Sequence, residues 1–169
     1  MKIFGIVGMS GSGKTELVVK LIPELIGRGI DVSTIKHTHH NVELDSPGKD
    51  SYRHRHSGAK QVMISSAGRW ALVHELRDTS EPSLQELLEK FDSVDLLLVE
   101  GFKREGHDKL EVFRHDHEQE LLSPDDDTIL AVAGDGPIDG LKVPLIDLNN
   151  VPAIADFILE HTGLDKNQP

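Results

Sequence analysis

A glycine-rich stretch near the amino terminus places the strongest constraint on the fold of this chain. Residues Gly8 to Thr15 read GMSGSGKT, which fits the pattern G-x-x-x-x-G-K-[ST], and the apolar run Ile3 to Val7 precedes them. Glycines let the backbone turn sharply with its N–H groups pointing inward, and a helix that opens at about Gly13 adds its positive end to this anion-binding nest. The sequence therefore predicts a strand, a phosphate-binding loop and a helix, in that order.

This loop predicts a nucleotide-binding site with a divalent cation. Lys14 is expected to reach the β- and γ-phosphate oxygens of a nucleoside triphosphate, and the Thr15 hydroxyl to be one ligand of the accompanying Mg²⁺. The alternative is a flexible turn with a solvated Lys14, which the preceding strand disfavours. The predicted nucleotide-binding residues are Gly8, Met9, Ser10, Gly11, Ser12, Gly13, Lys14 and Thr15.

Composition limits the classes of partner. The 169 residues suit one domain, or one domain with an arm, and the formal net charge of −11 argues against broad electrostatic attraction to nucleic acid or anionic membranes. The absence of cysteine excludes a disulfide scaffold and thiolate metal sites, and it fits a reducing cytoplasm. Apolar runs such as Leu96 to Val99 are far too short to cross a bilayer. We therefore expect a soluble cytoplasmic protein without a targeting segment.

The residues after the loop indicate a β-α-β unit. Apolar side chains recur at helical spacing, at Leu17, Val18, Leu21, Leu25 and Ile26. Pro23 lies inside this pattern and predicts a kink or a break. Residues 31–36 then alternate in the manner of a strand, so the nucleotide is expected at the carboxyl end of a parallel sheet.

A second segment, residues 93–102, contains a continuous apolar run, which predicts a strand in the middle of that sheet. The run ends in Glu100. A carboxylate at the tip of a strand beside the phosphate loop can hold Mg²⁺ through its water shell, which is the role of a Walker B acid. The alternative is that Glu100 simply begins a surface turn.

The middle of the chain is polar and locally basic. Residues 36–51 predict a loop, and residues 51–58 a short helix with concentrated positive charge. Lys49, Arg53, Arg55 and the nearby histidines either contact the phosphates of a second anionic ligand or cover a solvated helix face. Residues 61–65 and 70–76 predict a hairpin, and Thr79 or Ser80 is expected to cap the next helix.

The carboxyl-terminal part supplies candidates for reading the base. We expect strands at 109–114, 128–133 and 142–146 and a last helix at 151–159 that ends near Gly163. The N-K-x-D tetrad by which many GTPases read guanine is absent. One carboxylate can accept both edge N–H groups of guanine, and Asp135 and Asp147, each beyond a predicted strand, are the candidates for this role.

Other functions could use the same loop. Ten histidines raise the alternative of a metal-delivery GTPase, although their spacing repeats no zinc-ligand pattern. A small-molecule kinase would need a lid with arginines and an acceptor site. A nucleotide-responsive binding module without chemistry is a third alternative.

Four segments in this order resemble the molybdopterin-guanine dinucleotide biosynthesis adaptor family, MobB. They are Gly8 to Thr15, KHTHH at 36–40, DSPGKDS at 45–51 and LVEGFK at 98–103. The resemblance covers nearly the whole chain. It implies an α/β, P-loop NTPase-like three-layer fold with a mostly parallel central sheet, in a homodimer that binds GTP and Mg²⁺ and hydrolyses GTP weakly. Such a protein would assist the guanylyltransferase that attaches GMP to molybdopterin.

The resemblance also implies roles for individual residues. Glu100 would be the Walker B acid and would hold Mg²⁺ together with Thr15, and the residues bordering the site would be Lys36, His37, Asp45, Lys49 and Arg53. Strands outside the nucleotide-binding core would pair across the dimer, for which 69–76 and 109–114 are the candidates. No glutamine or arginine finger can be assigned, which agrees with slow hydrolysis.

Overall fold

The computed structural model describes residues 1–38, 42–116 and 120–164. These residues form two compact units, one made of residues 1–37 with the chain from residue 91 onward, and one made of residues 38–90. The chain length suits one domain, or one domain with an arm, and the contacts divide the chain at these two points. Each unit is therefore described by itself.

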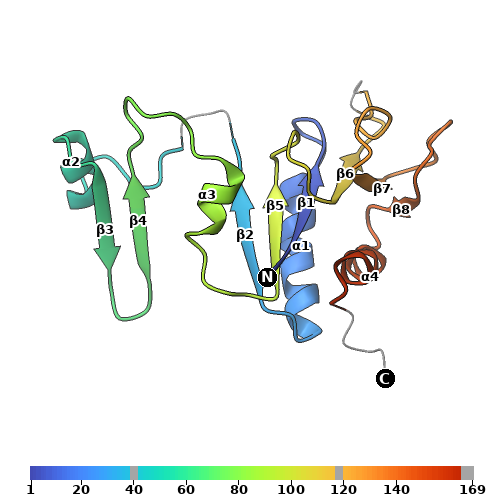
Figure 1. Cartoon of the computed structure of the whole chain (residues 1–169), viewed down its shortest axis with the longest axis horizontal. Coiled ribbons are helices and arrows are strands. Elements are labelled where there is room, and N and C mark those ends of the chain that lie inside the picture. Colours follow the sequence, from blue (N-terminus) through green and yellow to red (C-terminus); the bar gives the residue numbers. More distant parts are fainter. Residues whose placement is uncertain (39–41, 117–119, 165–169) are drawn as a thin grey trace. The chain divides into compact units, whose positions relative to one another are not determined.

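The first unit is built on a sheet of six strands in the order β2-β5-β1-β6-β7-β8 (Figure 1). All neighbouring strands in it are parallel, so their carboxyl ends lie at one edge of the sheet. This confirms the predicted α/β class with a mostly parallel central sheet. The strands are β1 Lys2–Val7, β2 Val32–Lys36, β5 Leu96–Glu100, β6 Lys109–Phe113, β7 Ile129–Gly134 and β8 Leu145–Asp147.

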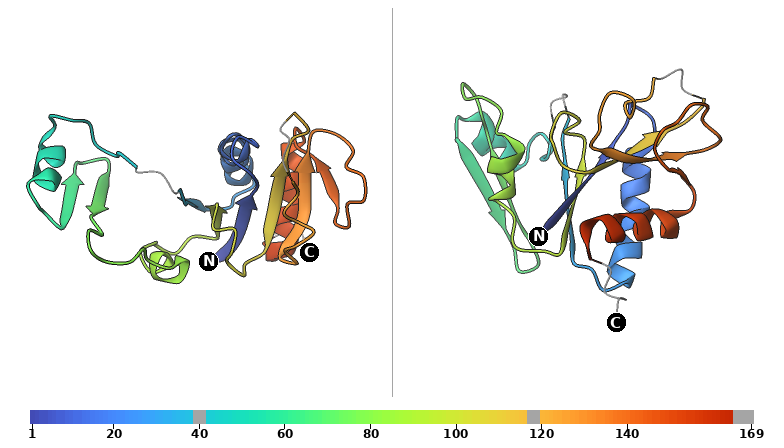
Figure 2. Two further views of the ribbon diagram at one scale, coloured as in Figure 1. Left: turned by 90° about the horizontal axis from the view of Figure 1, so that it is seen from above. Right: turned by 45° about the vertical axis from the view of Figure 1, so that its right-hand side comes forward.

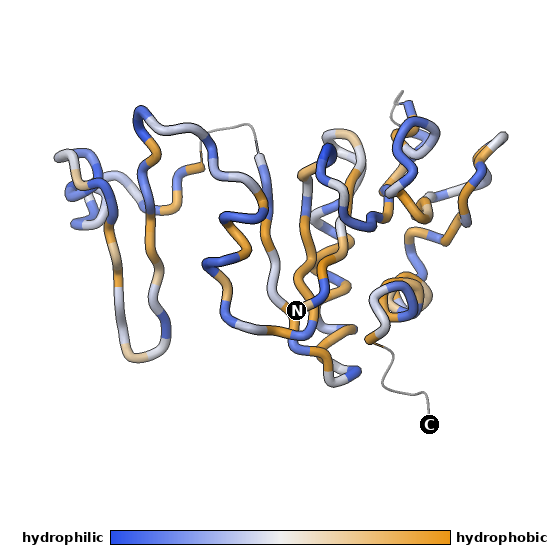
Figure 3. Tube along the Cα trace, viewed as in Figure 1, coloured by the Kyte–Doolittle hydropathy of each residue, from blue (hydrophilic) through white to orange (hydrophobic). Residues whose placement is uncertain are grey.

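Two helices, α1 Lys14–Gly27 and α4 Val151–Thr162, bury one face of this sheet and pack against each other (Figure 2). Phe4 and Ile6 of β1 lie in the same apolar core as Leu21 of α1 and Ile158 of α4, and all four side chains are fully buried. The hydrophobic trace of β1 and β5 is visible in Figure 3. Because α1 continues to Gly27, the predicted break at Pro23 does not occur.

The opposite face carries two buried charges on β6, which loop residues neutralise. Lys109 is 1% exposed, and its Nζ donates to Asp126 Oδ2 at 3.1 Å and to the Thr128 hydroxyl. Glu111 is equally buried and accepts hydrogen bonds from two backbone N–H groups, those of Leu122 at 2.8 Å and Ser123 at 2.9 Å. The segment between β6 and β7 is thereby held against the sheet, since a buried charge without a partner would be strongly destabilising.

The position of β6 corrects one expectation. The segment 109–114 was a candidate for a strand outside the nucleotide-binding core that pairs across a dimer. Instead β6 lies between β1 and β7 in the interior of the sheet, and both of its edges are already paired. It therefore has no free edge for a second copy.

The second unit contains α2 Asp50–His56, the antiparallel hairpin of β3 Gln61–Ser65 and β4 Trp70–His74, and α3 Leu84–Leu88. The hairpin confirms the prediction. The predicted cap at Thr79 or Ser80 is wrong, because Ser83 caps α3: its hydroxyl accepts from Glu86 N–H at 3.3 Å, and the Glu86 carboxylate accepts from Ser83 N–H at 2.8 Å.

The hairpin exposes apolar side chains on both of its faces. Val62 is 7% exposed, whereas Met63 and Leu72, which pair directly across the strands, are 62% and 44% exposed. Trp70 lies on the same face as these two and is 64% exposed. Met63, Trp70 and Leu72 therefore expose apolar side chains on one face of the hairpin, and Ile64 on the other face is 45% exposed. No helix of the described residues has the length and apolar character to span a membrane.

Candidate nucleotide-binding site

The glycine-rich loop has the predicted conformation. It joins the end of β1 at Val7 to the start of α1 at Lys14, and Gly8, Gly11 and Gly13 have φ of 140°, 82° and 97°. A Cβ atom on Gly8 would lie 2.4 Å from the carbonyl oxygen of Val112, so this position excludes every other residue type. The strand, loop and helix therefore have the geometry of a phosphate-binding loop, at the carboxyl edge of the sheet.

Lys14 bends back over the loop. Its Nζ donates to the carbonyl oxygen of Met9 at 2.7 Å. Burial lowers the pKa of Lys14, the Glu100 carboxylate opposes this shift, and the ammonium groups of Lys103 and Lys36 add to it. Three lysines are thus close enough to interact at the loop of a chain whose net charge is −11, which is the local field that a triphosphate requires.

Thr15 and Glu100, the two residues predicted to hold Mg²⁺, lie in contact. Thr15 Oγ1 donates to Glu100 Oε1 at 2.8 Å, and the Glu100 side chain is only 10% exposed. Lys36 Nζ lies 2.9 Å from each of these two oxygens. Because Glu100 pairs with Lys36 on one side and Ile6 on the other, the sheet brings Lys36 and Glu100 together, and Thr15 joins them from the first turn of α1.

The position of the Lys36 ammonium indicates whether Thr15 and Glu100 fit a divalent cation. It sits between a hydroxyl oxygen and a carboxylate oxygen, which are ligands that Mg²⁺ accepts. One carboxylate, one hydroxyl and the phosphates of a nucleotide are the usual donors for Mg²⁺, so the pair fits. Among the described residues there is no group of three or more His, Cys, Asp and Glu that could hold a metal ion.

His37 borders the same edge, as the resemblance implies. Its N–H donates to the carbonyl oxygen of Glu100 at 2.9 Å, and its ring lies 4.5 Å from that of Phe102, centroid to centroid. Gly101 and Phe102 have φ of 95° and 50°. A positive φ at a phenylalanine is uncommon and is held here by the turn that follows Glu100.

Sequence reasoning gave no role to two cations at the loop, Lys103 and Arg114. Lys103 Nζ lies 3.5 Å from Met9 Sδ, and Arg114 Nε donates to the carbonyl oxygen of Ser12 at 3.2 Å. Lys103 follows β5 and Arg114 follows β6, the two strands that flank β1. The sequence does contain a signal for them: a basic residue follows each of the two strands that flank β1. Because parallel strands end at the same edge of a sheet, such residues lie near the loop.

The two candidate base-reading carboxylates already accept hydrogen bonds. Asp135 Oδ1 accepts from the N–H of His115 at 3.1 Å and from its Nδ1 at 2.8 Å. This contact lowers the pKa of Asp135 and raises the pKa of His115. Asp147 Oδ1 accepts from the N–H of Asn149 at 2.8 Å. Both residues lie at the ends of adjacent parallel strands, and their role toward a base stays a prediction.

Comparison with known proteins identifies the family. The model of the family described as MobB, molybdopterin guanine dinucleotide synthesis protein B, matches residues 3–135. The chain belongs to the MobB family. A MobB relative from Escherichia coli (strain K12), named molybdopterin-guanine dinucleotide biosynthesis adapter protein, is 46% identical over 157 residues, which cover 89% of this chain and 87% of the relative.

Two further comparisons agree with this assignment. A protein of the same name from Haemophilus influenzae is 47% identical over 162 residues, covering 92% of this chain and 86% of the relative. A crystal structure titled molybdopterin-guanine biosynthesis protein B (mobB) superposes with a TM-score of 0.74 at 31% identity, over 94% of this chain and 99% of that one. The fold described above is therefore that of MobB proteins, which have a P-loop NTPase-like fold.

Three residues that the MobB resemblance places at the border of the site, Asp45, Lys49 and Arg53, belong to the second unit, so their role there stays a prediction. The guanidinium of Arg55 binds three carboxylates, those of Asp45 and Glu43 at 2.7 Å each and of Glu75 at 3.0 Å. Its hydrogen bond lowers the pKa of Asp45. Arg55 is thus committed within the chain rather than to a second anionic ligand. The histidines at 39 and 40 lie outside the described residues.

Proposed function

We propose that this chain binds GTP with Mg²⁺ at the glycine-rich loop and acts as the adapter that assists the attachment of GMP to molybdopterin. Membership of the MobB family makes it a protein of molybdopterin guanine dinucleotide synthesis. Its relatives in Escherichia coli and Haemophilus influenzae are named adapters of that biosynthesis. The proposal carries this adapter role to the present chain.

The contact between Thr15 and Glu100, bridged by Lys36, is the observation that carries the proposal. It supports a cation site beside the loop, where Mg²⁺ would take the place of the Lys36 ammonium. A Mg²⁺ ion in this position would neutralise the phosphates of the nucleotide. Lys14 and Lys103 would supply further positive charge from the loop side.

Slow hydrolysis is part of the proposal. Fast GTPases position the attacking water with a glutamine or neutralise the transition state with an arginine finger, and these groups contribute orders of magnitude. In residues 1–38, 42–116 and 120–164 the only glutamines are Gln61 and Gln85, and both belong to the unit that does not carry the loop. Arg114 lies at the loop, where its Nε donates to the carbonyl oxygen of Ser12 at 3.2 Å. We therefore expect nucleotide binding, rather than rapid turnover, to control the adapter.

The open face of the hairpin supports a homodimer. Met63, Trp70 and Leu72 expose a contiguous apolar surface, and a two-stranded hairpin alone is only marginally stable in water. A second copy of the chain would cover this face. The candidate segment 69–76 includes β4, so this part of the expectation is kept, whereas 109–114 is excluded by its position in the central sheet.

Calorimetry tests the binding part of the proposal. GTP, GDP and ATP are titrated with and without Mg²⁺ into the wild type, into Lys14→Ala and into a control, Lys20→Gln, which removes an exposed charge from α1. We expect Mg²⁺-dependent binding with a preference for GTP, retained in the control and lost in Lys14→Ala. Equal affinity for ATP would contradict the guanine preference, and unchanged binding by Lys14→Ala would contradict the site.

An assay with the guanylyltransferase, molybdopterin and Mg²⁺-GTP tests the adapter role. The wild type is expected to raise the yield of guanine dinucleotide, while Lys14→Ala, which we expect not to bind GTP, is expected to have no effect. A yield that does not change when the wild-type chain is added would refute this role.

A further inference from the structure

Arg114 contacts the glycine-rich loop through the backbone of the loop. It directly follows β6, a strand that pairs with β1, so the sheet carries its side chain to the edge at which the loop begins. Its Nε donates to the carbonyl oxygen of Ser12 at 3.2 Å. A Cβ atom on Gly13 would lie 3.2 Å from the same Nε and 3.5 Å from Nη2. The guanidinium therefore lies against the peptide group that joins Ser12 to Gly13.

This contact fixes the direction of one N–H group of the loop. No peptide bond of the described residues is cis, and in a trans peptide the carbonyl oxygen and the N–H point in opposite directions. The Gly13 N–H therefore points away from Arg114. Gly13 is the N-cap of α1, and the first N–H groups of a helix have no partner inside it. An N–H group in this position is placed to donate to a phosphate oxygen.

The guanidinium also makes this N–H a stronger donor. A hydrogen bond from a charged group is stronger than one from a neutral group, and it polarises the peptide that accepts it. Because Arg114 lies on the carbonyl side of the peptide, it is not placed as an arginine finger, which must reach the transferred phosphoryl group. Its contact with the loop is therefore consistent with slow hydrolysis.

Both partners of this hydrogen bond are held from behind. Ser12 is fully buried, and a Cβ atom on Gly8 would lie 2.8 Å from its Oγ, so the Ser12 side chain is packed against Gly8. Nη1 of Arg114 lies 4.0 Å from Asp135 Oδ2. Since β6 and β7 are paired up to their last residues, Arg114 and Asp135, which directly follow them, leave the sheet side by side. The fold thus fixes the guanidinium and the carbonyl independently of any ligand.

We propose that Arg114 is a positioning residue of the nucleotide site, which holds the Ser12–Gly13 peptide so that its N–H donates to the phosphates. The inference rests on the proposed function, since it requires phosphates at the loop. It adds a residue that acts through the backbone and not on the metal or the base. Because the N–H groups of such a loop cradle the α- and β-phosphates, Arg114 contributes to binding of diphosphates and triphosphates alike.

Calorimetry with GTP, GDP and inorganic pyrophosphate, each with Mg²⁺ and with a chelator, tests this role. Arg114→Met keeps the length of the side chain and removes the donor, whereas Arg114→Lys keeps a charged donor. The Arg114 side chain is 36% exposed, so both variants should fold. We expect Arg114→Met to weaken all three ligands by roughly fivefold to tenfold, with or without the metal, and Arg114→Lys to recover most of this loss.

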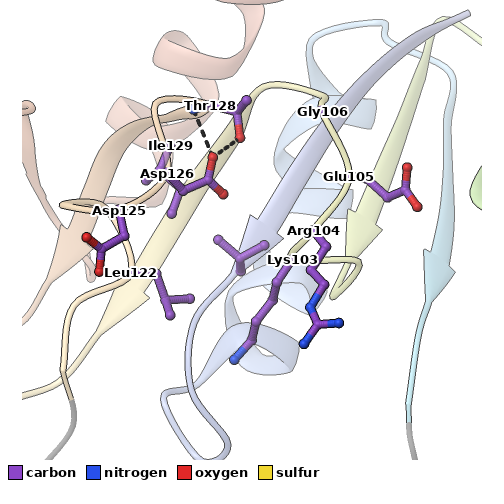
Figure 4. A pocket seen from close by; sticks show the side chains of 10 residues that line it. Lys103, Arg104, Glu105, Gly106, Leu122, Asp125, Asp126, Thr128 and Ile129 are labelled. Carbon is purple, nitrogen blue, oxygen red and sulfur yellow. Dashed lines mark hydrogen bonds between the residues drawn. The ribbon is translucent and has the colours of Figure 1, made fainter.

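Arg104→Met is the matched control, because it removes the same charge near the loop without a contact to Ser12. Arg104 lies in the turn after β5, the other strand beside β1, and lines a cavity of about 450 Å³ there. Figure 4 shows its side chain extending beside that of Lys103. We expect the affinities of this variant to stay within about twofold of the wild type.

The amide NMR resonance of Gly13 in the GDP complex gives a readout that overall stability does not move. It is expected to shift upfield in Arg114→Met, because the peptide loses its polarising partner, and to return toward the wild-type position in Arg114→Lys. An unchanged Gly13 resonance would overturn the inference. So would an affinity of Arg114→Met within about twofold of the wild type, or roughly 0.4 kcal/mol.

Pyrophosphate separates an effect on the loop from an effect on the base. If Arg114→Met weakens GTP and GDP but not pyrophosphate, the side chain acts through the base end of the site and the inference is wrong. The proposed function is tested by the wild type in the same experiment. If the wild type and Arg114→Met bind GTP equally, the positioning role fails and the nucleotide site stands, whereas a wild type that binds no nucleotide refutes both.

Discussion

Lys36 and Glu100 end neighbouring parallel strands, and the ammonium of one lies 2.9 Å from the carboxylate of the other. The same ammonium lies 2.9 Å from the Thr15 hydroxyl, so it lies between the two side chains that are proposed to hold Mg²⁺. The proposed Mg²⁺ site can be tested by substituting Glu100, the carboxylate that the Lys36 ammonium contacts.

Glu100→Gln is expected to weaken Mg²⁺-dependent GTP binding by about tenfold or more, or ~1.4 kcal/mol, because the carboxylate charge that balances the metal is lost. The amide oxygen can still accept from Thr15, so the fold should be retained. Calorimetry with Mg²⁺ and with a chelator measures both affinities. An equal loss in the presence of the chelator would mean that Glu100 acts on the loop and not on the metal.

Gly8→Ala is expected to lower the free energy of unfolding by roughly 2 to 4 kcal/mol, since the new Cβ would lie 2.4 Å from Val112 O and the φ of 140° is strained for alanine. Gly27→Ala is the matched control, because nothing lies within 4 Å of its Cβ position. The control should be neutral or stabilising within about 1 kcal/mol. Thermal and denaturant unfolding of the two variants checks the contrast, and similar losses in both would contradict it.

The His115–Asp135 contact is expected to make stability depend on pH. Nδ1 of His115 faces Asp135 at 2.8 Å and Nε2 faces the carbonyl oxygen of Pro137 at 3.0 Å, so only the imidazolium donates to both. Its pKa is raised in the fold, first by the hydrogen bond to Asp135. The stabilisation is therefore complete below the unfolded pKa of about 6.5 and is lost as the pH rises through the folded value.

This dependence is measured by denaturant unfolding of the wild type and of His115→Gln. The measurements run from about pH 6 to about pH 9, roughly the range in which a histidine with a raised pKa titrates. The advantage of the wild type should shrink as the pH rises. The titration of the other histidines cancels in the difference. A constant difference across the range would show that the ring acts by packing alone.

Trp70→Ser is expected to shift the proposed dimer toward monomer, because Trp70 is 64% exposed on the open hairpin face. Val19→Ser on α1 is the control, as Val19 is 57% exposed but lies on a helix outside that face. Sedimentation equilibrium of the three proteins gives the association constants. If the wild type is already monomeric at micromolar concentration, the dimer proposal fails.

The sequence predicts those parts of the fold that are specified locally. Local sequence alone specifies the loop Gly8 to Thr15 and the buried strand that ends at Glu100. The parallel pairing of β1 with β5 then brings Thr15 and Glu100 into contact. The cap of α3 was also readable, since Ser83 and Glu86 have the spacing of a capping box.

The burial of β6 could not be predicted in this way. Lys109 and Glu111 alternate with apolar residues, a pattern typical of a strand with one face in water. The face is closed by the loop that connects β6 to β7, whose Asp126 and Thr128 side chains and backbone N–H groups provide partners for the two charges. Which loop returns to a strand is a property of tertiary structure that periodicity does not contain.

A tethered ammonium at Lys36 also means that, in the proposed site, Mg²⁺ would bind in competition with this side chain. The side chain is present at an effective concentration on the order of millimolar or higher, so free ion must displace it before the octahedral shell can form. In the absence of nucleotide, the loop thereby keeps its own counter-ion and its own order. Shortening or removing that side chain would end this competition and leave the Glu100 carboxylate without its counter-ion.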